Sequence, residues 1–172
     1  MHLSHRNLAQ MKREKLNQTE IDRDFLSLAL KISRESDDPK AKVVPASGVG
    51  AIVANAELEY VASANIIPPR LRSHLTLKDT TDARRYTHIE HAERAAIFKA
   101  CTSGFNVAGA TMYCTRFPCS DCARAIVFSG IKRFVVPTGF SGEAGWVGSQ
   151  RAALDILRIA NVTVRYLALG KA

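Results

Sequence analysis

Three side chains with the chemistry of zinc ligands lie between residues 91 and 122. His91 is followed, after an apolar stretch, by the run Pro118-Cys119-Ser120-Asp121-Cys122. Imidazole nitrogen and thiolate sulfur are the borderline-soft donors that suit zinc. Three protein ligands leave the fourth tetrahedral position for water, which is typical of a catalytic zinc site. The sequence therefore predicts one catalytic Zn²⁺ per chain, bound by His91, Cys119 and Cys122.

A carboxylate follows the candidate histidine by two residues, at Glu93. Zinc lowers the pKa of bound water from about 15.7 to about 7, which supplies hydroxide without a strong base. The pattern H-x-E followed by P-C-x-x-C resembles a known signature of zinc-dependent deaminases. The resemblance implies hydrolytic deamination, with zinc-bound hydroxide as nucleophile and Glu93 as proton shuttle to the ring and the leaving nitrogen. Positions two apart in an ideal helix project about 200° from each other, so Glu93 is not expected to be a ligand beside His91.

Both halves of this motif are expected at helix starts. Thr87-His88-Ile89-Glu90 is a capping-box pattern that predicts a helix after it. Pro118 is expected to open a second helix over 119–129. Cys119 and Cys122 are three residues apart, so they lie on one face of the first turn of this helix. A helix N-terminus and a bound metal both lower the pKa of a thiol at such a position.

The remaining periodicity predicts alternating helices and strands. We expect a first helix that starts at the capping pattern Thr19-Glu20-Ile21-Asp22 and runs to about Glu35. We also expect a hairpin of strands 49–54 and 58–64, strands at 110–115, 131–136 and 162–167, and a last helix over 146–160. This order implies an α/β fold whose mixed five-stranded sheet has an initial hairpin and parallel later strands. Ligands of such sheets bind beyond the carboxyl ends of strands, where helices begin, which agrees with the position of the zinc motif.

Size and composition indicate one globular domain over 19–172, preceded by a basic N-terminal arm, 1–18. No apolar run reaches the roughly 18 residues of a membrane span, and the N-terminus lacks the core of a signal peptide. We therefore expect a cytoplasmic protein with no membrane partner, in which the cysteines stay reduced. The net charge of +8 favours an anionic partner, a nucleotide or a nucleic acid, unless it only reflects solvated surface residues.

The segment from Arg70 to Arg85 lacks periodicity and follows Pro68-Pro69, so we expect a long loop there. Its arginines are candidates for phosphate binding, with a solvated surface role as the alternative for each: Arg70, Arg72, Arg84 and Arg85.

A structural zinc site is the alternative to a catalytic one, and it would need a fourth ligand. Cys114, Cys101 and His88 are available. Both cysteines lie in apolar patterns that are typical of buried small side chains. His88 is typical of a surface residue near a helix cap.

These residues resemble the zinc-dependent cytidine deaminase superfamily, and within it the deoxycytidylate (dCMP) deaminase branch. The specific part is His91-Ala92-Glu93 with the run 118–122, and the likeness extends from about Phe25 to Leu167. The resemblance implies a three-layer α/β/α cytidine-deaminase-like fold. It also implies the zinc ligands and the catalytic role of Glu93 given above, and substrate contacts at Asn65, Ala92, Thr115, Phe117 and Pro118.

The chain also departs from the branch. Ser63-Ala64-Asn65-Ile66 stands where the family has a Gly-Tyr-Asn-Gly-type turn, and the branch's extra cysteine and histidine ligands are not evident before His91. The loop over 66–86 is therefore expected to bind substrate differently.

The resemblance implies deamination of dCMP to dUMP, or of a close cytosine nucleotide, by a homo-oligomer. One alternative is a deaminase of a base in tRNA or single-stranded nucleic acid, although the chain lacks a basic stripe with interleaved aromatic residues. Others are a deaminase of a free base such as cytosine or guanine, and a non-catalytic zinc-stabilised module, for which Glu93 would have no use.

Overall fold

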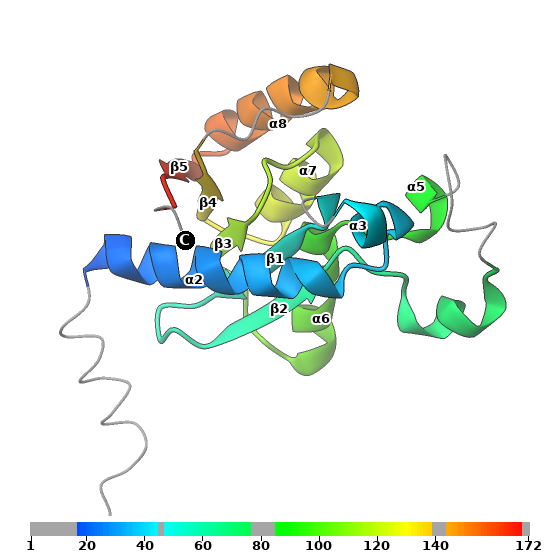
Figure 1. The fold of residues 1–172 in the computed structure, drawn as a ribbon. Helices are drawn as coiled ribbons and strands as arrows, with labels where there is room; N and C mark the ends of the chain where they lie inside the picture. Colours follow the sequence, from blue (N-terminus) through cyan, green and yellow to red (C-terminus); the bar gives the residue numbers. More distant parts are fainter. Residues whose placement is uncertain (1–16, 45–46, 77–84, 139–143, 170–172) are drawn as a thin grey trace, which may run out of the picture.

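A five-stranded mixed sheet forms the centre of the protein in a computed structural model, which describes residues 17–44, 47–76, 85–138 and 144–169 (Figure 1). The strand order is β2-β1-β3-β4-β5. β1 pairs antiparallel with β2 and β3, whereas β3, β4 and β5 are parallel. The predicted initial hairpin and parallel later strands are therefore confirmed. The strands are β1 (Gly50–Ala54), β2 (Tyr60–Ala64), β3 (Thr111–Cys114), β4 (Arg133–Pro137) and β5 (Thr163–Leu167).

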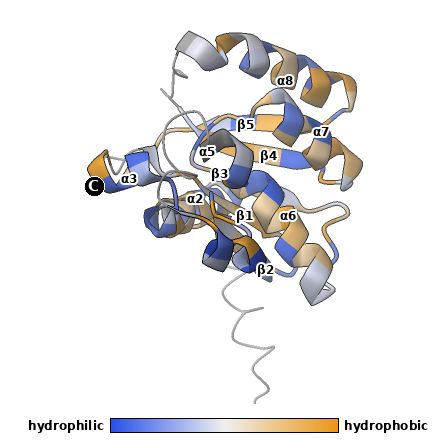
Figure 2. Cartoon of the chain, turned by 90° about the vertical axis from the view of Figure 1, so that its right-hand side faces the viewer, coloured by the Kyte–Doolittle hydropathy of each residue, from blue (hydrophilic) through white to orange (hydrophobic). Residues whose placement is uncertain are grey.

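Helices cover both faces of this sheet, because successive strand residues point to opposite sides. Ile52 and Ala54 of β1 pack in a cluster with residues of α2 (Gln18–Ile32). Ala51 and Val53 pack on the other face, in a cluster with residues of α6 (Ala92–Ser103), α7 (Ser120–Phe128) and α8 (Val147–Ile159). Figure 2 shows hydrophobic and hydrophilic residues alternating along α7 and α8, as expected of helices that bury one side. The predicted three layers are confirmed.

Short helical segments complete the described chain. They are η1 (Ser33–Glu35), α3 (Pro39–Val43), η3 (Pro69–His74), α5 (Arg85–His88) and η5 (Ala144–Trp146). η3 lies in the predicted long loop, of which residues 77–84 fall outside the described part. Residues 1–16 of the predicted N-terminal arm also fall outside the described part. No helix in the described ranges is both long enough and apolar enough to cross a membrane.

Local hydrogen bonds shift two element boundaries from their predicted places. Asn17 caps α2 and forms a capping box with Glu20, so the helix begins at Gln18, just ahead of the start predicted at Thr19. The second hairpin strand begins at Tyr60 instead of Leu58. The Asn55 side chain accepts hydrogen bonds from the N–H groups of residues 57 and 59, and Leu58 takes a positive φ of 65° inside that turn.

Gly50 at the start of β1 permits the close approach of α2 to the sheet. A Cβ added there would lie 2.1 Å from the backbone oxygen of Ala29, far inside van der Waals contact. Any side chain at this position would therefore force the helix away from the strand.

A buried carboxylate joins α2 to three strands. Asp22 is fully buried and accepts hydrogen bonds from Arg133 of β4 and from the Tyr113 hydroxyl of β3, the latter at 3.1 Å. Arg165 of β5 lies 3.0 Å from the same carboxylate. Burial raises the pKa of Asp22, but the hydrogen bonds from Arg133, Gln18 and Tyr113 outweigh it and hold the pKa below its usual value.

Replacement of Asp22 by Asn should lower the free energy of unfolding by about 3 kcal/mol at pH 7, because two half-buried guanidinium groups lose their counter-charge. The folded-state pKa is depressed, so this contribution is present above the ordinary aspartate pKa and is lost as the pH falls through the folded-state value. Urea denaturation of both proteins between pH 7 and pH 3 measures the difference. A difference under about 1 kcal/mol at pH 7, or one that grows on acidification, would contradict this account.

Candidate active site

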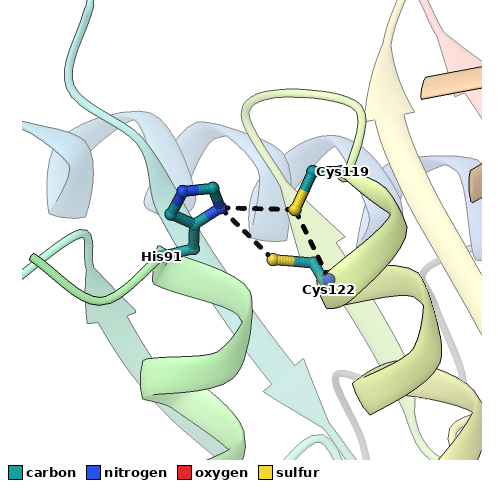
Figure 3. A group of neighbouring side chains, drawn as sticks. All are labelled: His91, Cys119 and Cys122. Atoms are coloured by element: carbon teal, nitrogen blue, oxygen red, sulfur yellow. Dashed lines mark hydrogen bonds between the residues drawn. The ribbon is translucent and has the colours of Figure 1, made fainter. Parts of the chain in front are cut away.

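The three predicted zinc donors converge at one point between α6 and α7 (Figure 3). His91 Nδ1 lies 3.6 Å from Cys119 Sγ and 3.4 Å from Cys122 Sγ. Zinc bonds of about 2.3 Å to sulfur and about 2.0 to 2.1 Å to nitrogen, at tetrahedral angles, separate a sulfur from a nitrogen ligand by about 3.5 Å. The donor atoms therefore already have the spacing that a tetrahedral zinc ion requires.

His91 and Cys119 are both N-cap residues. His91 precedes α6 with ψ 146°, and Cys119 precedes α7 with ψ 170°. The predicted cap at Thr87 is wrong, because Thr87 lies in α5. Glu90 is held instead in an isolated β-bridge with Ile66, with backbone hydrogen bonds of 2.8 and 3.1 Å, so α6 cannot begin before it. Since His91 has an extended backbone, the helical angle expected between it and Glu93 does not apply.

Glu93 is the second residue of α6 and only 4% exposed. Burial raises the pKa of its carboxyl group, and the nearby His91 partly opposes this. Glu93 is not in the group of mutually close donor atoms. Its position is that of a desolvated carboxyl group beside the donors, as a proton carrier requires.

The pKa values of the two thiols are shifted in opposite directions. The hydrogen bond with Cys122 lowers the pKa of Cys119 to about 4 against the effect of burial, and His91 assists. The same hydrogen bond and burial raise the pKa of Cys122. One thiolate therefore forms readily, and a second requires a cation next to it, which a bound zinc ion would provide.

Arg94 supplies positive charge from outside the donor group. Its guanidinium pairs with Glu90 and lies 3.8 Å from Asp121, so it bridges the start of α6 and the first turn of α7. Burial lowers the pKa of Arg94, but the acidic groups of Glu90, Cys122 and Cys119 outweigh this effect, so the pKa is raised overall. The Glu90 oxygen that accepts from Arg94 also accepts from the His91 N–H at 2.9 Å. This network fixes the backbone of one donor relative to the helix of the other two.

The proposed fourth ligands of a structural site do not join the donors. Cys101 is exposed on α6, and Cys114 is buried in the apolar cluster beside α6 and α7. Across the part of the chain that the structure describes, His91, Cys119 and Cys122 are the only close group of three or more potential ligands. No fourth described residue therefore fills the remaining coordination position.

Two of the predicted substrate-binding residues lie on either side of the β1 start. Asn65 accepts a hydrogen bond from the Val49 N–H at 2.9 Å through Oδ1, and Thr115 accepts one from the Gly50 N–H at 3.1 Å. Both side chains are buried. Among the described residues Nδ2 of Asn65 has no hydrogen-bond acceptor, so a buried donor remains available to a ligand.

The other three residues predicted to contact substrate are Ala92, Phe117 and Pro118. Ala92 is buried as the first residue of α6, and Pro118 is buried directly before Cys119. Phe117 stacks on Tyr166 with ring centroids 6.1 Å apart and contacts Phe134 edge-on, so its ring packs against the core.

Of the four arginine candidates, the structure describes the side chains of Arg70 and Arg72. Arg72 pairs with Asp37, whose Oδ2 also accepts from the Ile67 N–H at 3.0 Å. Arg70 is exposed on η3. Arg84 and the side chain of Arg85 lie outside the described residues.

Trp146 was not predicted as a site residue, yet its ring lies edge-on to His91 with centroids 5.8 Å apart. In the sequence it reads only as an apolar residue at a helix start, so periodicity gives no signal of this contact. Glu90, Arg94 and Asp121 were missed for the same reason, since each looks like an ordinary surface charge.

Comparisons with known proteins agree with this geometry. A family model described as the cytidine and deoxycytidylate deaminase zinc-binding region matches residues 19–138. The deoxycytidylate deaminase of Pongo abelii is 31% identical over 147 residues, which cover 82% of this chain and 76% of that enzyme. The deoxycytidylate deaminase of Enterobacteria phage T2 is 45% identical over 75 residues, 43% of this chain and 36% of that enzyme, so this chain matches only about a third of the phage relative's length.

A solved structure has a similar fold. The dCMP deaminase of the cyanophage S-TIM5, described in complex with dCMP and dUMP, superimposes with a TM-score of 0.66 and 22% identity. The match covers 88% of this chain and 100% of the cyanophage chain.

Loss of the Arg94 charge should weaken zinc binding by about tenfold or more, because an outer partner that orients the donors and offsets the thiolate charge is removed. We expect this for Arg94→Met, measured by competition with a chelator. Arg124 also pairs with Asp121, but it is exposed, with 62% of its side chain accessible, so Arg124→Met is the matched control. Equal zinc affinity of Arg94→Met and the unsubstituted protein would contradict this role, as would an equal loss in the control.

Proposed function

The chain belongs to the cytidine and deoxycytidylate deaminase family, and we propose that it hydrolyses dCMP to dUMP and ammonia. The observation that carries this proposal is the tetrahedral spacing of His91, Cys119 and Cys122 next to the buried Glu93. The substrate is proposed from the curated relatives, which are deoxycytidylate deaminases of phages and mammals. In the reaction, water adds to C4 of the cytosine, the bond to the exocyclic nitrogen breaks, and a carbonyl group forms.

We propose that His91, Cys119 and Cys122 bind one Zn²⁺. The donor set fits zinc in both chemistry and spacing. Zinc bound there would supply a nucleophile at neutral pH by lowering the pKa of a coordinated water molecule. The helix N-termini at residues 91 and 119 direct their positive dipole ends toward the thiolates and stabilise them.

Glu93 is proposed as the proton carrier. Its pKa is raised by burial, so the carboxyl group can hold a proton at a pH closer to neutral than an exposed glutamate can. The carboxylate takes one proton from the attacking water and delivers it to the ring nitrogen, where it remains in the uracil product. It then carries the second proton, from the hydroxyl group added at C4, to the leaving amine. Water would compete for these transfers in an open site, and the burial of Glu93 excludes it.

Asn65 and Thr115 are proposed to contact the nucleotide. Backbone N–H groups occupy one acceptor on each side chain and so fix its orientation. The Asn65 amide can then donate to a sugar or base oxygen through Nδ2, and the Thr115 hydroxyl still has a proton to donate. Arg70 is proposed for the phosphate in place of Arg72, whose charge is matched by Asp37. The reaction fits the cytoplasm, where the thiols remain reduced.

Glu93→Gln should keep the zinc and lose activity on dCMP by about 10²- to 10⁴-fold, because only proton transfer is removed. Cys119→Ala should lose zinc and activity together. Ammonia release and metal content measure both effects, and Glu57→Gln, the same change in the exposed hairpin turn, is the control. Normal turnover by Glu93→Gln would overturn the mechanism. If the unsubstituted protein released ammonia from cytidine, cytosine or guanine but not from dCMP, the substrate would be wrong.

We also propose that the protein is a homo-oligomer. Phe128, at the end of α7, is 97% exposed, and Phe98 and Ile159 on α6 and α8 are more than half exposed. Large aromatic side chains so fully in water are typical of a surface that another chain covers.

Phe128→Ser should therefore shift the mass measured by sedimentation toward that of one 18.8 kDa chain. Val43→Ser, at an 83% exposed position on α3, is the control and should leave the mass unchanged. A single-chain mass for the unsubstituted protein at micromolar concentration would refute the proposal.

A further inference from the structure

Trp146 occupies the side of the site from which α8 begins. It ends η5 and directly precedes α8, and its side chain is half-buried. Its ring lies 5.8 Å from that of His91 at an angle of 64° between the ring planes. Since His91 Nδ1 is one of the converging donors, the indole lies within one layer of side chains of the metal position.

Hydrogen bonds hold the start of α8 against the start of α7, and so determine where Trp146 lies. Ser149, one helical turn after Trp146, accepts a hydrogen bond from the Ser120 N–H at 2.9 Å and shares another with the Ser120 hydroxyl at 3.1 Å. Ser120 directly follows Cys119. The two helices lie side by side in Figure 1. The indole is thus positioned through Ser120, the neighbour of Cys119, and it packs on the ring of His91.

An indole ring has flat apolar faces on which another planar ring can stack. The ring meets His91 edge-on, and the side chain is only half-buried, so part of it is accessible. A pyrimidine base is planar and stacks on aromatic side chains, and the carbon that reacts must approach the position next to His91. A base whose reacting carbon lies next to His91 therefore comes within reach of the indole.

We propose that Trp146 contacts the bound nucleotide and determines how tightly the substrate binds, as one wall of the site beside His91. This inference rests on the proposed function, because it takes a pyrimidine nucleotide as the ligand. Packing on His91 without any contact to substrate is the competing role, and it makes different predictions for binding and for metal retention.

The decisive experiment uses the fact that Trp146 is the only tryptophan of the chain. Titration of the zinc-loaded protein with dUMP should change the intensity or wavelength of tryptophan emission, and the change should be half complete at the dissociation constant. Trp146→Ala should raise KM for dCMP and the dissociation constant of dUMP, the latter measured by calorimetry, by about tenfold. The value of kcat should stay within about threefold, and the zinc content should stay unchanged. Trp146→Phe keeps an aromatic ring and should restore most of the affinity.

Leu154→Ala is the matched control, since Leu154 is a partly exposed apolar residue of the same helix, two turns away from Trp146. It should leave KM unchanged. Emission that does not respond to saturating dUMP would overturn the inference, and so would a Trp146→Ala variant that loses zinc while its KM stays within about twofold. Failure of the unsubstituted protein to deaminate dCMP would instead refute the proposed function, and this inference with it. The activity of the unsubstituted protein therefore separates the two failures.

Discussion

Two helix starts must bring three soft donors within about 3.5 Å of one another, and much of the structure serves that constraint. His91 and Cys119 are the N-caps of α6 and α7, so each helix begins at the residue that faces the metal position. A sheet with parallel strands gathers helix starts at one edge, because each helix follows a strand in the same direction. The spacing that zinc requires thus arises from backbone geometry and not from long, adaptable side chains.

The charges around this point are arranged to tolerate two sulfur anions and a carboxylate in a buried place. Without compensation such a group would be costly, since buried like charges raise one another's pKa values. The two helix dipoles, the His91 ring and Arg94 oppose this effect, and a divalent cation would complete the balance. Asp22 solves the opposite problem on the other face of the sheet, where two arginines and a tyrosine surround one carboxylate. These two polar centres differ in purpose: one fixes α2 to the sheet, and the other leaves a coordination position open.

Much of the fold followed from the sequence, because strong periodicity and turn residues mark its central elements. The sequence predicted all five strands, and it predicted that the first two form a hairpin and the later ones are parallel. It also predicted the helices after residues 91 and 119. The three residues predicted as zinc donors from residue type and spacing lie close together in the structure. Prediction failed where tertiary contacts override a local signal. Thr87 matches a capping box, but the bridge between Ile66 and Glu90 delays the helix to Ala92. The short α3, which Asp38 caps, was not predicted.

The residues around the donors were the least predictable. Trp146 and His91 are far apart in sequence, and only the packing of α8 on α7 joins them. Likewise, nothing in a one-dimensional pattern distinguishes Arg94 from Arg124, although only Arg94 reaches both Glu90 and Asp121. Arg72 shows the opposite error. Its residue type and its place in the loop suggested phosphate binding, but in the structure it pairs with Asp37.

The central claim is that one zinc ion is held by two sulfurs and one imidazole, with a position left for solvent. X-ray absorption spectroscopy of the zinc-loaded protein tests it most directly. The account predicts two sulfur scatterers at about 2.3 Å and two light atoms at about 2.0 to 2.2 Å, with the multiple-scattering signature of a single imidazole. A spectrum with three or four sulfurs, or with two imidazoles, would mean that protein fills every position and would contradict the account.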